Sequence, residues 1–417
     1  MKEKIFDFIE KNIPLVRELE TELSKRPAIS PDSGGEGEKD KCDFLRQWLC
    51  EHGIDQIEQH DAPDPRAKGG IRPNLIATIP GREDGPDKPR VWIMSHIDVV
   101  PPGDINLWET DPWTVVWKDD APLGPRLIGR GVEDNQQGLV SSVLAALAFT
   151  EQKITPRLTV KLLFAADEEM GSDYGISWLI RNRRELFRAS DMVLIPDSGD
   201  ETGSSIEIAE KNLLWAKFTT TGKQTHGAHP DQGINAHLAG ADLAVSLHYK
   251  LSEKFSARDP LFDPDYSTFQ PTKKEANVPN INTIPGDDVF YMDMRILPQY
   301  PVNLVLEEIG RIMADIEAKY GVSIGYSLAQ KMESQPTSAD APLVKHLSRI
   351  IEGVYQVKCK PIGIGGGTVG AYLRNEGIDS VVWCRINHTA HQPNEYALIA
   401  NILGDAKVMA LLMLGEE

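Results

Sequence analysis

Imidazole and carboxylate side chains recur in this sequence at the points where apolar runs end. The runs "RVWIMS", "RLTVKLLFAA", "DMVLIP" and "SVVWCRIN" are each followed by such residues, and a further carboxylate lies in "GRGVEDNQQG". The residues are His96 and Asp98, Asp134, Asp167-Glu168-Glu169, Asp197, and His388 with His391. Two histidines with several carboxylates are the donor set of zinc. A carboxylate shared between two ions would let them lie about 3.5–4 Å apart, as in dinuclear sites.

The adjacent pair Glu168-Glu169 suits such a site, because successive side chains at a strand end diverge. One carboxylate can then bind metal while the other faces the attacking water as a general base. Asp98, two residues after His96, can accept the second ring N–H and fix the tautomer. Taken singly, each of these residues is more often structural. As a set at successive strand ends, they predict a metal site.

The elements that would position these residues alternate between strands and helices. Apolar stretches at 74–80, 90–97, 157–166 and 191–199 predict strands, and 137–152 and 175–187 predict helices. Helical spacing also covers 3–25 and roughly 40–52. Such alternation predicts an α/β fold with a mostly parallel sheet covered on both faces. Ligands bind beyond the carboxyl ends of such strands.

The pattern changes near residue 209. A strand at 213–222, a helix at 233–251, a proline- and charge-rich stretch at 252–280, a strand at 288–296 and a helix at 302–320 follow in order. They predict two helices against a small antiparallel sheet that also includes 322–330. From about 331 the earlier pattern resumes, ending in a helix at 396–414. We therefore expect one α/β domain, 1–208 and 331–417, interrupted by an inserted α+β domain, 209–330.

The length, charge and cysteine content of the chain indicate its domain number and exclude some classes of binding partner. A chain of 417 residues is long for one core, which favours two domains. A formal net charge of −18 argues against nucleic-acid or anionic-membrane partners. No apolar stretch is long enough to span a membrane, and four cysteines without a CxxC pair favour reduced thiols and a cytoplasmic location.

The segment "GIGGGTVG" matches the GxGxxG pattern through Gly365, Gly367 and Gly370. A dinucleotide site would need this pattern in the first βαβ unit, with an acidic residue about 20 positions further on. Because it lies near the C-terminal end without that acid, we interpret it as a backbone cradle for substrate.

The ordered motifs resemble the M20 metallopeptidase family, which includes acetylornithine deacetylase, succinyl-diaminopimelate desuccinylase and carnosine-type dipeptidases. The resemblance covers nearly the whole chain. It rests on "MSHIDVV", "GRGVEDNQQG", "LLFAADEEMGS", "LIPDSG", "THGAHPDQGINA", "DMRILP", "GIGGGT" and "HTAHQPNE". It implies a catalytic domain at 1–208 and 331–417, and a lid or dimerisation domain at 209–330.

The resemblance also implies roles at the metal site. His96 and Asp197 would hold one Zn²⁺ and Glu169 and His391 a second, with Asp134 bridging both. Co²⁺ or Mn²⁺ could stand in place of zinc. Glu168 would be the general base, with Asp98 behind His96. His388 is a rival to His391, which is preferred because Asn394-Glu395 follows it closely.

In the inserted domain, the resemblance implies that His226 polarises the scissile carbonyl across a homodimer interface, with His229 as a nearby rival. Arg295 would grip the carboxylate of the substrate. Further substrate contacts would come from Asn282, Gly366, Gly367 and Thr368.

The expected function is zinc-dependent hydrolysis of amide bonds in short peptides or N-acyl amino acids, by attack of a zinc-bridging hydroxide with Glu168 as base. A deacylase of the acetylornithine or succinyl-diaminopimelate type is an alternative to a peptidase. An M28-type aminopeptidase is disfavoured by the insertion. A catalytically silent metal-binding protein stays open, because Gln136 stands where the family usually has lysine.

Overall fold

The chain divides into two compact units. In this computed structural model, which describes residues 1–415, the first unit comprises Met1–Ile208, Thr337–Pro361 and the residues from Tyr372 onward. The second unit comprises Ala209–Pro336 and Ile362–Ala371.

The segment Ile362–Ala371 differs from the sequence boundaries, which put it in the α/β domain. Its polar contacts explain why it belongs to the second unit. The N–H of Lys211 donates to the Ile364 carbonyl at 2.9 Å, and Arg295 Nη1 donates to the Gly365 carbonyl at 2.8 Å.

A mixed sheet with a parallel centre forms the frame of the first unit. Its strands are β1 (Ile57–Pro63), β2 (Ile71–Ile79), β3 (Val91–His96), β6 (Val160–Ala165), β7 (Met192–Asp200), β8 (Ser205–Glu210), β15 (Lys360–Ile364) and β16 (Asp379–Arg385). The last residues of β8 and β15 are assigned to the second unit. Among the described residues, the order is β1-β2-β6-β3-β7-β16-β8-β15. The central strands β6, β3, β7 and β16 run parallel, whereas β1, β2 and β8 pair antiparallel. The α/β class predicted from the sequence is confirmed.

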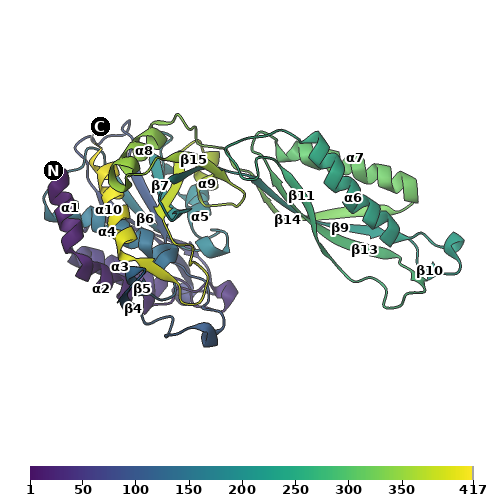
Figure 1. Ribbon diagram of the computed structural model, residues 1–417, viewed down its shortest axis with the longest axis horizontal. Coiled ribbons are helices and arrows are strands. Elements are labelled where there is room, and N and C mark those ends of the chain that lie inside the picture. The colour runs from purple at the N-terminus through teal and green to yellow at the C-terminus, as the bar shows by residue number, and fades with distance from the viewer. Residues whose placement is uncertain (416–417) are drawn as a thin grey trace. The chain divides into compact units, whose positions relative to one another are not determined.

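Helices cover this sheet. They are α3 (Lys39–Glu51), α4 (Gly138–Glu151), α5 (Ile176–Asn182), α8 (Pro342–Tyr355), α9 (Gly370–Asn375) and α10 (Ile399–Leu414). The connection through α4 leads from β3 to β6 in one direction, and that through α5 leads from β6 past β3 to β7 in the other. Right-handed crossovers therefore put α4 and α5 on opposite faces (Figure 1).

The N-terminal segment expected as one helix is two helices, α1 (Lys2–Lys11) and α2 (Ile13–Ser24). Pro14 explains the break, because inside a continuous helix its ring would clash and a hydrogen bond would be lost. In the first turn of α2 it needs no N–H, and the Asn12 carbonyl accepts from Leu15 and Val16 at 3.1 and 3.2 Å.

Helix α4 is apolar on all sides and packs against α10 in the core, which suits a fully buried helix. Its first residue, Gly138, allows a close approach to β7. A Cβ atom there would lie 2.3 Å from the Pro196 carbonyl oxygen, next to Asp197.

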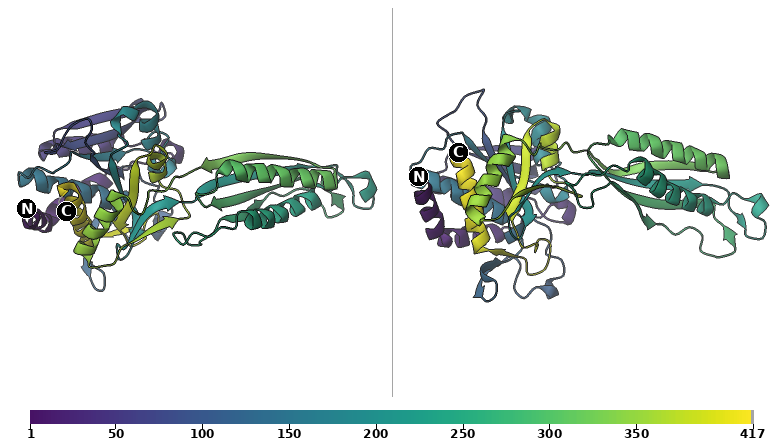
Figure 2. Two further views of the ribbon diagram at one scale, coloured as in Figure 1. Left: turned by 90° about the horizontal axis from the view of Figure 1, so that it is seen from above. Right: turned by 45° about the horizontal axis from the view of Figure 1, so that its top comes forward.

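The second unit is an antiparallel sheet with two helices. The sheet contains β9 (Asn212–Thr221), β11 (Thr268–Lys274), β13 (Asp287–Ile296) and β14 (Ser323–Met332), in the order β11-β13-β9-β14. Helices α6 (Ala236–Lys254) and α7 (Val302–Tyr320) lie side by side on it (Figure 2). Phe218, Leu243, Phe290 and Ile309 lie in their shared core.

Short strands complete the fold. The hairpin β4 (Val116–Asp120) and β5 (Gly124–Ile128) is joined by β17 (Tyr396–Leu398), and β10 (Thr225–His226) pairs with β12 (Thr283–Ile284). The β5–β17 pairing brings the segment before Asp134 beside the segment after His391. Within residues 1–415, every helix is too short or too polar to cross a bilayer.

Candidate metal centre

The five side chains predicted as metal ligands form two groups that share Asp134. His96, Asp134 and Asp197 offer donor atoms within 4.8 Å of one another, and so do Asp134, Glu169 and His391. His96 ends β3 and Asp197 lies in the neighbouring parallel strand β7, so both reach the same sheet edge.

Asp134 uses a different oxygen toward each group. Its Oδ1 lies 3.0 Å from His96 Nε2, and its Oδ2 lies 3.0 Å from His391 Nε2. The other distances are 3.4 Å from His96 Nε2 to Asp197 Oδ1 and 3.0 Å from His391 Nε2 to Glu169 Oε2. Ligand atoms around a tetrahedral ion with bonds of 2.0–2.1 Å lie about 3.3 Å apart. The donors therefore suit two ions bridged by one carboxylate.

The neighbours of His96 and Asp197 set their orientation. His96 Nδ1 lies 3.0 Å from the main-chain oxygen of Asp98 and 3.4 Å from its carboxylate, which leaves Nε2 to face the group. The expected carboxylate contact is thus the longer of the two. Asn135, joined to Asp134 by a cis peptide, donates from Nδ2 to Asp197 Oδ1 at 2.8 Å.

A buried carboxylate, Glu395, holds the turn that carries Asp134. It accepts the backbone N–H groups of Gly131, Glu133 and Asp134 at 2.9–3.0 Å and pairs with Arg130 at 2.6 Å. Sequence reasoning used Glu395 only as part of the His391 pattern. Its position next to a proposed ligand motif was the available signal for a positioning role.

Glu133 holds the loop that ends at His391 in the same way. Its carboxylate accepts the N–H groups of Asn387 at 2.6 Å and of Thr389, and the Thr389 hydroxyl at 2.7 Å. Sequence reasoning missed Glu133, although it precedes Asp134. His388 is exposed in this loop and belongs to neither metal group among residues 1–415.

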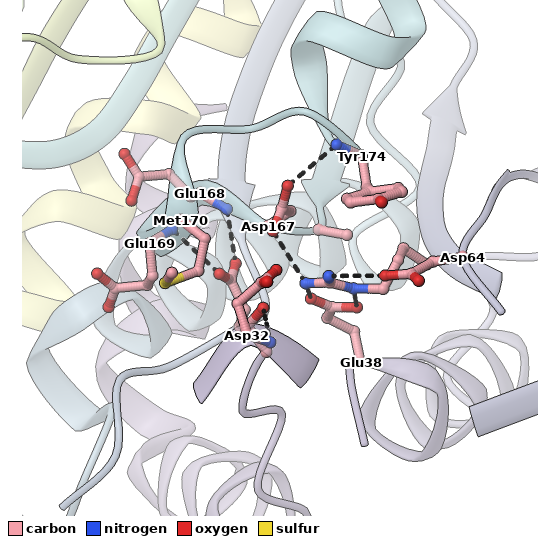
Figure 3. Close-up of polar contacts among 12 residues, drawn as sticks. Asp32, Glu38, Asp64, Asp167, Glu168, Glu169, Met170 and Tyr174 are labelled. Carbon is pink, nitrogen blue, oxygen red and sulfur yellow. Dashed lines mark hydrogen bonds and ion pairs between the residues drawn. The ribbon is translucent and has the colours of Figure 1, made fainter. Parts of the chain in front are cut away.

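Glu168 and Glu169 lie in a tight turn after β6. Asp98 accepts the N–H of Glu168 at Oδ1 and that of Glu169 at Oδ2, both at 3.1 Å. In Figure 3 the two glutamate side chains extend to the same side of the turn, and the Glu168 carboxylate ends above that of Glu169. Glu169 joins His391, whereas Glu168 is in neither ligand group of the described chain.

The electrostatics of the site favour cations. Burial and the Asp197 carboxylate raise the pKa of Glu168 well above its usual value. Hydrogen bonds with Asp134 and Glu169 raise the pKa of His391 to about 10. Negative charge is thus crowded around two imidazoles, and bound divalent cations would compensate it.

The other predicted residues lie in the second unit. His226 and Asn282 are neighbours there, because β10 pairs with β12 and the Gly227 N–H donates to the Asn282 carbonyl at 2.7 Å. The His226 side chain is exposed, and its Nδ1 accepts the Ala228 N–H at 3.1 Å. The His229 ring lies 6.1 Å from that of His226, centroid to centroid.

Arg295 is held by its own neighbours. Nε and Nη2 donate to Asp293 at 2.6 and 2.8 Å, and Nη1 donates to the Gly365 carbonyl. Of its five N–H donors, two have no acceptor in the described chain. The predicted contacts Gly366, Gly367 and Thr368 follow Gly365 directly, and the Thr368 hydroxyl donates to Glu210.

Gln136 is buried against α2 and is not a member of either metal group in residues 1–415. With its amide oriented to donate, Nε2 lies 3.0 Å from Glu20 Oε2 and 3.2 Å from Ser24 Oγ. Gln136, which replaces the lysine usual in the family, therefore contacts α2 and is not one of the proposed metal ligands.

Comparison with known proteins gives the class of this protein, a metallohydrolase of the peptidase or deacylase type that acts on amide bonds. The model of peptidase family M20/M25/M40 matches residues 92–415. An uncharacterized metallohydrolase of Methanococcus maripaludis is 38% identical over 412 residues, 94% of this chain and 96% of that protein. A succinyl-diaminopimelate desuccinylase of Coxiella burnetii is 25% identical over 326 residues, 76% of this chain and 82% of that protein.

Two solved structures share the fold. The di-peptidase Dug1p from Saccharomyces cerevisiae aligns with a TM-score of 0.71 at 17% identity, over 99% of this chain and 98% of that one. A dinuclear metal-binding peptidase from Bacillus subtilis aligns with a TM-score of 0.64 at 16% identity, over 98% and 99%. The chain belongs to peptidase family M20/M25/M40.

Proposed function

We propose that the protein is a dinuclear zinc hydrolase of amide bonds in small substrates that carry a carboxylate, namely short peptides or N-acyl amino acids. One observation carries the proposal: two donor groups share Asp134 through its two oxygens, with the non-ligand Glu168 beside them. Histidine and carboxylate donors favour zinc, and Co²⁺ or Mn²⁺ could replace it.

When bound, two zinc ions would acidify the attacking water and polarise the scissile carbonyl. Glu168 takes a proton from this water while the water oxygen attacks the carbonyl carbon. Glu168 then gives the proton to the amine nitrogen as the C–N bond breaks.

His226 supplies a donor to the carbonyl oxygen in this proposal, from the partner of a homodimer. The support is its location. His226 is exposed on the second unit, whereas the proposed ligands and Glu168 belong to the first. A side chain on a separate unit must reach the reaction by closure or across an interface.

Arg295 would bind the carboxylate of the substrate through its two remaining N–H donors, with Asp293 and Gly365 holding the guanidinium in place. Asn282, Gly366, Gly367 and Thr368 would complete the substrate contacts. The similarity to a desuccinylase supports a second candidate, an N-acyl amino acid deacylase.

The test is turnover after metal removal and reconstitution. The metal-free protein should be inactive, and two equivalents of Zn²⁺ per chain should restore hydrolysis in a panel of dipeptides and N-acyl amino acids. Cleavage of dipeptides alone would favour the peptidase, and cleavage of N-acyl amino acids alone would favour the deacylase. A zinc-loaded protein that cleaves nothing in either panel would point to the silent metal-binding alternative.

A further inference from the structure

A buried cation, Arg72, connects three carboxylates beneath the turn of Glu168 and Glu169. Nε of Arg72 donates to Glu38 at 2.5 Å, and Nη2 donates to Glu38 and, at 3.1 Å, to Asp167 Oδ1. Nη1 lies 3.6 Å from Asp64 Oδ2. The side chains of Arg72 and Glu38 are fully buried, and Asp64 and Asp167 are at most 3% exposed.

Asp167 is the residue through which this cluster reaches the site (Figure 3). It directly precedes Glu168 and has a φ of +64°, in the left-handed region that most side chains avoid and that aspartate and asparagine tolerate better. Both carboxylate oxygens are occupied: Oδ1 accepts from Arg72 and Oδ2 accepts the Tyr174 N–H at 3.0 Å. These bonds hold Asp167 in that conformation.

The turn is thus held at three consecutive residues. Arg72 fixes Asp167 by its side chain, and Asp98 fixes the N–H groups of Glu168 and Glu169. Without Arg72, the Asp167 carboxylate would keep only the bond from the Tyr174 N–H, and a rotation of Asp167 toward a more common backbone conformation would swing the two glutamates that follow it.

We propose that Arg72 is a positioning residue that acts through Asp167 to hold Glu169 at its metal ion and Glu168 at the attacking water. The inference rests on the proposed function for the roles of the two glutamates. Glu38 and Asp64 serve it indirectly, because they compensate the buried charge of Arg72 and fix its guanidinium plane.

Arg72→Lys keeps the charge but loses the planar fork that spans Glu38 and Asp167. Asp167→Asn keeps the shape and tolerates a positive φ, while it removes the ion pair. Competition of Zn²⁺ with a chromophoric chelator then measures each of the two ions separately. One ion should bind about 10–100-fold more weakly in each variant, with the other unchanged, because Glu169 belongs to one donor group only.

Arg66→Lys is the matched control. Arg66 pairs with Asp64 at 2.9 Å in the same cluster, and its bonds are to Asp64, Asp32 and Tyr174 rather than to Asp167. Its zinc affinities and kcat should match those of the wild type. The thermal unfolding temperature of every variant should be measured alongside, so that binding is compared on folded protein.

The double variant Arg72→Lys/Asp167→Asn decides the route. If Arg72 acts through Asp167, the double variant should lose no more zinc affinity or kcat than the stronger single variant, and KM should change little. Losses that multiply, or single variants with zinc affinities equal to those of Arg66→Lys, would overturn the inference. A wild-type protein that binds two ions yet hydrolyses nothing would refute the proposed hydrolase alone, because the zinc affinities still test the role of Arg72.

Discussion

Exchanging Glu168 and Glu169 separately for glutamine should produce two defects of different kind. The residues are adjacent and the chemical change is the same, so each variant is the control of the other. Glu169 is one of three donors in the group with Asp134 and His391, whereas Glu168 is a member of neither group in residues 1–415. Neither exchange removes a donor or acceptor from the bonds between these two backbone N–H groups and Asp98.

For Glu168→Gln, the metal content should stay at two ions per chain and kcat should fall by about 10²–10⁴-fold, the contribution of a general base. That corresponds to about 3–5 kcal/mol of activation free energy. For Glu169→Gln, the metal content should fall toward one ion, because the His96–Asp134–Asp197 group keeps all of its donors.

Elemental analysis after dialysis measures the metal content, and steady-state hydrolysis of the best substrate measures kcat and KM. Near-normal kcat in a fully loaded Glu168→Gln variant would remove Glu168 from the mechanism. Two tightly bound ions in Glu169→Gln would refute its assignment as a ligand.

Three further outcomes are expected. Asp134→Ala should lose both ions while Asp197→Asn keeps one, and two retained ions in the former would exclude a bridge. Mixing inactive His226→Ala with inactive Glu168→Gln, under verified subunit exchange, should partly restore activity, because each mixed dimer holds one complete site. A mixture that stays inactive would contradict the role of His226 in trans. Burial raises the pKa of Asp405 to about 7, so the folded protein retains a proton that the unfolded chain releases near pH 4. Stability from this group therefore falls as the pH rises from about 4 to 7, and the free energy of unfolding of Asp405→Asn relative to wild type, measured in urea, should rise over that interval by up to about 4 kcal/mol.

The sequence alone predicted the parts of the fold that depend on local burial. Strands β3, β6 and β7 and helix α4 are apolar runs, and the length and spacing of their apolar residues indicate a buried strand or helix. Because parallel strands end at one edge, the residues after them had to gather there, which predicted the metal site. The break between α1 and α2 was missed, although Pro14 disfavours a continuous helix.

Elements with little apolar pattern were missed. Strand β11 lies in the stretch described as proline- and charge-rich. It is an exposed edge strand, and an edge strand tolerates Pro271 because the missing N–H does not interrupt the hydrogen bonds of a central strand. Strand β8 was missed for another reason, because Ile206 and Ile208 do alternate with Ser205 and Glu207. The hairpin β4–β5 was also absent from the prediction. Such strands are specified by their pairing partners rather than by their own periodicity.

Only the tertiary structure decided how the site is held. Glu395 binds the turn of Asp134 and Glu133 binds the loop of His391, across more than 250 positions of sequence. Arg72 reaches Asp167 across 95 positions. A carboxylate that accepts backbone N–H groups leaves no periodic trace, because any buried acid can do so once the chain brings those groups near. Burial patterns are local and can be read along the chain, whereas these bonds depend on which distant segments the fold makes neighbours.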